Sequence, residues 1–111
     1  MDDTKALLWA AIEDYVGLWE AVWELRALHP DAIPNELTDR AKTILSDFLR
    51  DGLIHLYRVV EPDGEPEIIE DVQASGLLAS PESWEEPGPD WVTIRFSATA
   101  CGVQAYSGLP N

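Results

Sequence analysis

The chain has 111 residues with 21 acidic and 7 basic side chains, a formal net charge of −14 at neutral pH. This length fits one domain with its own core, and the negative charge opposes the attraction to phosphate on which nucleic-acid binding depends. The single cysteine, Cys101, excludes an intramolecular disulfide. We therefore expect a single domain over 1–111, located in the cytoplasm. We expect no membrane-spanning or signal segment, because Glu13 and Asp14 interrupt the first apolar stretch.

The first predicted element is one long helix from Thr4 to about Leu28, because its apolar residues recur at spacings of three and four. Two apolar stripes cover about 200° of its circumference, where a surface helix needs roughly 100°. We expect the second stripe either to enter the core or to form a contact surface for a partner protein or a second copy of the chain. The predicted contact residues are Trp9, Val16, Trp19 and Trp23.

A segment with two prolines ends this helix, and the next apolar periodicity predicts a second helix over 35–51. Asp31 or Asn35 is its expected N-cap. Gly52 follows where a left-handed residue is needed, and the apolar Leu53 comes next, as in a Schellman motif. Both ends of this helix are therefore marked in the sequence.

Alternating apolar and polar residues predict two strands, over 54–60 and 91–99, that pair as an antiparallel hairpin. Between them lies an acidic insertion, residues 61–90, which carries all ten acidic residues of the chain after Arg58 and no lysine or arginine. Its apolar residues suffice for one short helix, and its length indicates partial order or a function of its own.

The last predicted elements are a short helix over 100–106, capped by Thr99, and a flexible tail over 107–111. The order of helix, breaker, helix, Gly-Leu-Ile, strand, tip, strand and closing Thr-x-x-Gly helix resembles the winged helix-turn-helix domains of bacterial transcriptional regulators. The residues that carry the resemblance lie in the runs Leu45 to Tyr57 and Phe96 to Ala105. We predict an α+β, winged-helix-like fold with a long N-terminal helix, a second helix, a two-stranded hairpin with a long acidic insertion, and a short C-terminal helix.

The resemblance implies that helix 35–51 enters the major groove and that the acidic insertion acts as a wing beside the phosphates. It assigns the DNA contacts to five residues: Arg40, Lys42, Thr43, Ser46 and Arg50. The charge departs from the family pattern, since helix 35–51 has four acidic against three basic residues. Carboxylates near the groove oppose binding, so we expect no nucleic-acid partner. The segment before helix 35–51 is also short for the family's separate intermediate helix.

No group of residues with catalytic or metal-binding chemistry is recognisable. His29 and His55 form no ligand spacing with Cys101, and the acidic pairs lie on a helix face or in a proline-rich loop rather than in a cleft. No glycine-rich phosphate loop is present. We expect no enzymatic activity, no metal and no cofactor.

Three functions are compatible with these observations. The first is a protein-interaction module that binds a protein partner or forms a homodimer. It uses the aromatic stripe and the acidic insertion, with Glu85, Glu86 and Asp90 as charged contacts. The second is an acidic inhibitor or immunity-type protein that occupies a basic site on a nucleic-acid-acting partner. The third is a winged-helix transcriptional regulator with weak affinity for DNA.

Overall fold

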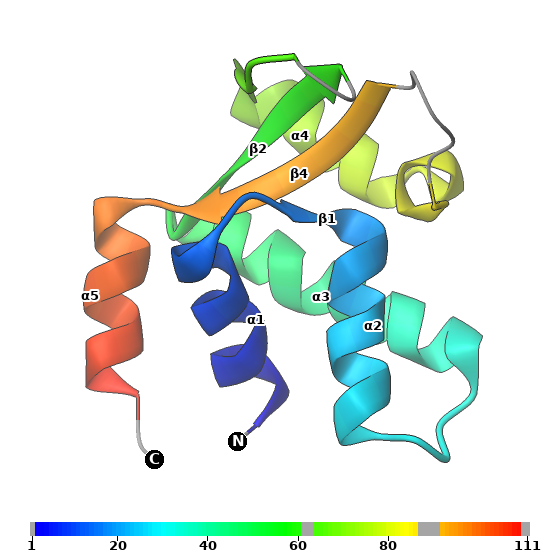
Figure 1. Cartoon of the computed structure of the whole chain (residues 1–111). Helices are drawn as coiled ribbons and strands as arrows, with labels where there is room; N and C mark the ends of the chain where they lie inside the picture. Colours follow the sequence, from blue (N-terminus) through cyan, green and yellow to red (C-terminus); the bar gives the residue numbers. More distant parts are fainter. Residues whose placement is uncertain (1, 61–63, 87–91, 110–111) are drawn as a thin grey trace.

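The computed structural model describes residues 2–60, 64–86 and 92–109, and Figure 1 shows their arrangement. The fold is α+β, with five α-helices, one 3₁₀ helix and a four-stranded antiparallel sheet in this described part. The elements, in chain order, are α1 (Asp3–Glu13), β1 (Val16–Gly17), α2 (Leu18–Leu28), α3 (Pro34–Arg50), β2 (Ile54–Val60), β3 (Glu67–Ile69), α4 (Asp71–Ala79), η1 (Pro81–Trp84), β4 (Val92–Ala98) and α5 (Ala100–Gly108).

The prediction of a single long N-terminal helix is wrong, because the chain forms two helices, α1 and α2. Asp14 is extended at the end of α1, and the next residues form β1, in which Val16 pairs with Phe96 of β4. Gly17 then serves as the N-cap of α2, and its backbone N–H donates to the Glu20 carboxylate at 3.1 Å. The apolar spacing continues across this break, so periodicity alone could not reveal it; pairing with a distant strand decides it.

The sheet has the strand order β1-β4-β2-β3, which corrects the predicted two-stranded hairpin. The two predicted strands do pair antiparallel, from Ile54 opposite Ala98 to Val60 opposite Val92. The short strands β1 and β3 add one neighbour on each side. Residue 91, the first of the predicted second strand, lies outside the described residues.

The helix α3 confirms the predicted second helix to within one residue at each end, but its N-cap differs. Ile33 is the N-cap and makes no side-chain cap hydrogen bond. Pro34 occupies the first helical position, where a missing N–H costs nothing and the fixed φ suits the helix. At the other end Gly52 has a φ of 72°, and the Leu53 N–H donates to the Phe48 carbonyl at 2.9 Å, which is the predicted Schellman motif.

The core lies between the sheet and the helices α1, α2 and α3, which occupy one side of the sheet in Figure 1. Leu56 of β2 and Phe96 of β4 face each other across the strand pair and are fully buried. Helix α5 runs beside α1, so the two ends of the described chain lie at the same end of the molecule. Thr99 accepts a hydrogen bond from the Gly102 N–H at 3.1 Å, which confirms the predicted cap. Helix α5 extends to Gly108, so the prediction of a flexible tail over 107–111 is wrong for residues 107 and 108, and residues 110–111 lie outside the described residues.

The described part of the acidic insertion is folded, as β3, α4 and η1. Ile69 of β3 pairs with Leu56 of β2, and α4 packs against α3. Trp84 in η1 is only 7% exposed, and its indole N–H donates to the Leu78 carbonyl at 2.9 Å. The predicted short helix is therefore present as α4, and together with β3 and η1 it packs onto the body of the domain.

Candidate interaction surfaces

The structure divides the predicted aromatic stripe between two helices. Trp9 belongs to α1, is 41% exposed and contacts Tyr106 of α5, with ring centroids 5.2 Å apart. Val16 is buried in β1, so the prediction of Val16 as a contact residue is wrong for the folded chain. Trp19 is half-buried on α2 and Trp23 is 46% exposed one turn further along. Trp9 therefore belongs to a different surface from Trp19 and Trp23.

A close backbone approach fixes the position of Trp19. The indole ring lies against Gly17, where a Cβ atom would be 2.3 Å from the ring. The Arg95 guanidinium lies over the same ring, 5.2 Å from its centroid. Arg95 also donates to the Tyr15 carbonyl at 3.0 Å and to the Glu20 carboxylate at 3.3 Å. These contacts hold Trp19 at the junction of β1, α2 and β4.

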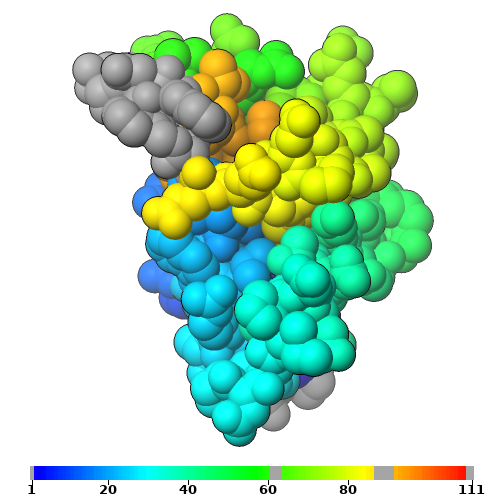
Figure 2. Space-filling view, turned by 90° about the vertical axis from the view of Figure 1, so that its right-hand side faces the viewer, coloured from blue at the N-terminus to red at the C-terminus, as the bar shows by residue number. Residues whose placement is uncertain are grey.

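The 3₁₀ helix η1 lies beside α2 and brings part of the acidic insertion next to Trp19. Figure 2 shows the yellow η1 segment against the blue surface of α2 and above the teal surface of α3. We call this region the α2–η1 face and define it by Trp19, Glu82 and Glu85, which line one cavity, and by Trp23, which is exposed one turn from Trp19 on α2. Glu85 and its neighbour Glu86, two of the predicted contacts, are exposed here; Asp90 lies outside the described residues.

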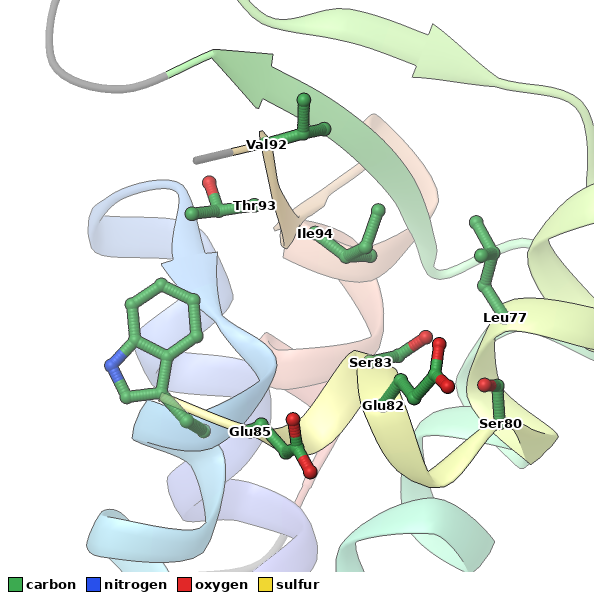
Figure 3. A pocket seen from close by; sticks show the side chains of 9 residues that line it. Leu77, Ser80, Glu82, Ser83, Glu85, Val92, Thr93 and Ile94 are labelled. Atoms are coloured by element: carbon green, nitrogen blue, oxygen red, sulfur yellow. The ribbon is translucent and has the colours of Figure 1, made fainter. Parts of the chain in front are cut away.

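A cavity of about 200 Å³ opens on the α2–η1 face. Apolar side chains from α2, α4 and β4 form part of its wall, and the carboxylates of Glu82 and Glu85 stand on the η1 side with the hydroxyls of Ser80 and Ser83 (Figure 3). The remaining lining residues are Trp19, Leu77, Val92, Thr93 and Ile94. Sequence reasoning missed Glu82 as a contact residue; the only signal for it was its place in the acidic insertion.

The acidic side chains of the insertion point to solvent. Seven of them are described and all seven are exposed: Glu65, Glu67, Glu70, Asp71, Glu82, Glu85 and Glu86. Within the described ranges none of the seven forms an ion pair. Lys42 of α3 lies beside Glu85 and offsets part of their negative charge. The rest of this charge remains available to a partner.

The buried carboxylate of Asp3 joins three helices and engages one of the predicted DNA contacts. Asp3, at the start of α1, is 4% exposed. It accepts hydrogen bonds from His29 Nε2, at 2.7 Å, and from Arg40 Nε of α3. Burial alone would raise the pKa of Asp3, but the hydrogen bonds from Arg40 and His29 and their charges outweigh it and lower the pKa. Arg40 therefore has a structural partner inside the domain.

The other predicted DNA contacts on α3 do not form a cationic patch. Arg50 pairs with two carboxylates, of Asp47 at 3.2 Å and Asp51 at 3.3 Å. Thr43 and Ser46 are exposed on the stretch of α3 between Asp39 and Asp47. Lys42 is half-buried beside Trp84 and Glu85 of the insertion. The structure thus brings these five residues onto one helix, as predicted, but carboxylates accompany both arginines.

A second aromatic surface, the α1–α5 face, consists of Trp9, Val103 and Tyr106. Val103 is 46% exposed on α5, one turn from Tyr106. The Lys5 ammonium lies 5.2 Å from the centre of the Tyr106 ring. Among the described helices α5 is the only one without an acidic or basic side chain. Tyr106 and Val103 were missed from the sequence because the helix containing them has no clear apolar stripe.

The described residues contain no group of three or more histidine, cysteine or acidic side chains arranged to hold a metal ion. Within the same residues no helix is both long and apolar enough to cross a bilayer. His55 lies on β2 near Tyr57, with ring centroids 6.4 Å apart, and Cys101 is exposed on α5. Comparison with protein-family models, with curated proteins and with solved structures gives no match.

Proposed function

We propose that this chain is a non-enzymatic protein-interaction module that docks a polypeptide partner on the α2–η1 face. The observation that carries the proposal is the juxtaposition of Trp19 with the exposed carboxylates of Glu82 and Glu85, which line one cavity, while the exposed Trp23 lies one helical turn from Trp19. Tryptophan is enriched among the residues that contribute most binding energy at protein interfaces. Complementary charge speeds association and selects the partner. The tryptophans of the α2–η1 face therefore supply binding energy, and its carboxylates supply selection of the partner.

The charge of the chain favours a basic partner. The formal net charge is −14, and the seven described carboxylates of the acidic insertion are free of ion pairs within the described residues. A basic polypeptide surface gains from this field, whereas nucleic acid is repelled. When this basic surface belongs to a nucleic-acid-acting protein, the chain functions as an inhibitor or immunity-type protein.

The test is affinity capture with matched tryptophan variants. The immobilised chain is exposed to a native lysate at low and high salt, and captured proteins are identified by mass spectrometry. Trp23→Ala should abolish capture of the partner, whereas Trp9→Ala, which removes a similarly exposed tryptophan from the α1–α5 face, should leave it intact. Equal capture by the wild type and the Trp23→Ala variant would show that the α2–η1 face is not the docking surface.

A second candidate function is self-association through the α1–α5 face. It is supported by the absence of charged side chains from α5, unlike the other described helices. Two copies of a chain this acidic repel each other least where their facing surfaces are uncharged. Sedimentation should then detect a dimer that Val103→Asp dissociates. A monomer at high protein concentration would exclude this function.

We also propose a winged-helix fold, with transcriptional regulation as the third candidate function. The fold proposal is supported by the order α1, β1, α2, α3, β2 and β4, in which α2 supplies the separate intermediate helix that the family requires. DNA binding receives less support, because both arginines of α3 form ion pairs within the chain. A gel shift at low salt tests it: saturable duplex binding that is weakened by Arg40→Ala with Lys42→Ala would favour a regulator.

A further inference from the structure

The cavity on the α2–η1 face combines apolar walls with an acidic rim. Leu77 reaches it from α4, and Val92 and Ile94 reach it from β4 (Figure 3). The carboxylates of Glu82 and Glu85 come from the η1 side and are exposed. A ligand that fills this cavity must therefore be apolar along its length and positively charged near the rim.

The volume of the cavity limits what it can hold. Pockets for drug-sized ligands measure roughly 300–1,000 Å³, and this cavity measures about 200 Å³. A cofactor is too large for it, whereas one amino-acid side chain is of suitable size. Arginine and lysine have the required division of properties, because their aliphatic stems pack on apolar surface while their charged ends stay near water and carboxylates.

The chain already uses a similar arrangement for one of its own arginines. The Arg95 guanidinium lies over the Trp19 ring and pairs with the Glu20 carboxylate. Arg95 thus pairs with Glu20 rather than with the insertion. Within the described residues Glu82 and Glu85 form no ion pair, and Lys42 lies beside Glu85 only. A second basic group, supplied from outside, meets complementary charge at the rim.

We propose that this cavity receives an arginine or lysine side chain of the partner polypeptide, with its stem against Leu77 and Ile94 and its charged end at Glu82 and Glu85. Charge complementarity identifies this occupant, and the exposed Trp23, one helical turn from Trp19, provides contact area for the residues that flank it. The inference rests on the proposed docking function and adds the chemistry that the α2–η1 face recognises.

The experiment is a nuclear magnetic resonance titration with a capped Gly-Arg-Gly tripeptide, which tests the cavity without the unidentified partner. Saturable shifts are expected at the Trp19 indole N–H and at the Ile94 methyl groups. The tripeptide with citrulline in place of arginine keeps the shape and removes the charge, and it should bind at least tenfold more weakly. Glu82→Gln with Glu85→Gln should weaken arginine binding by a similar factor.

The matched control is Glu65→Gln with Glu67→Gln, which removes two exposed charges from the same insertion outside the cavity. This variant should bind the arginine peptide within twofold of the wild type. Equal weakening by the two double variants would overturn the proposal, because it would mean attraction to net charge alone. Equal binding of citrulline, or no shift at the cavity, would overturn it as well. The capture experiment with Trp23→Ala tests partner docking independently of this result.

Discussion

The packing of the acidic insertion onto the domain can be tested by truncating Trp84. This side chain is almost fully buried, belongs to the hydrophobic core and lies beside Lys42 of α3, and its indole N–H donates to the Leu78 carbonyl of α4. Truncation of a buried tryptophan to alanine costs about 3–5 kcal/mol. One kcal/mol shifts Tm by about 4 °C in a domain slightly above 100 residues, so Trp84→Ala should lower Tm by roughly 12–20 °C.

Two further variants separate the origins of this loss. Trp84→Phe keeps an aromatic ring but leaves the Leu78 carbonyl without its indole donor, so it should cost about 1–3 kcal/mol. Trp23→Ala removes the same type of side chain from an exposed position and should change stability by no more than about 0.5 kcal/mol. Thermal and urea unfolding followed by circular dichroism measure all three. If Trp84→Ala were as stable as Trp23→Ala, the insertion would not be docked as described.

The remaining predictions concern the three-helix junction and two glycines. Asp3→Asn should destabilise the chain by about 1–3 kcal/mol, because it weakens the charge-assisted bonds from Arg40 and His29. Folding lowers the pKa of Asp3. The stability that the ionised Asp3 contributes is therefore present above the ordinary pKa, near 4, and is lost as the pH falls through the folded value. Urea unfolding from pH 7 to 3 should show the free energies of unfolding of the wild type and of Asp3→Asn converging. Gly17→Ala should displace the Trp19 ring and change its indole N–H resonance, because the added Cβ overlaps the ring; an unchanged resonance would contradict this contact. Gly52→Ala should lower stability by about 1 kcal/mol because of the positive φ, measured by the same unfolding assay.

The elements that the sequence predicted correctly are those with local signals. Helix α3 has an uninterrupted apolar spacing and a Gly-Leu end, and both features act within a few residues. The strands β2 and β4 alternate cleanly, and Thr99 caps α5 as its side chain allows. In each case the signal and the structure that it specifies occupy the same short segment.

The wrong predictions concern elements that form by contact with residues far away in the sequence. Val16 leaves the helical stripe because Phe96, 80 positions later, offers a strand to pair with. The insertion gains β3 because Leu56 presents an open strand edge to Ile69. The candidate site was likewise only partly predictable. Trp19 and Glu85 could be selected by residue type, but their meeting at one cavity required η1 to pack beside α2.

The amino-acid sequence by itself determined the acidity, the aromatic content, the C-terminal end of α3, the N-cap of α5 and the two main strands. Each of these follows from composition or from interactions among near neighbours. Tertiary structure decided where the first helix breaks, how the acidic insertion folds back and which tryptophan meets which carboxylate. These features arise from contacts between residues far apart in the chain, whose energies no local pattern records.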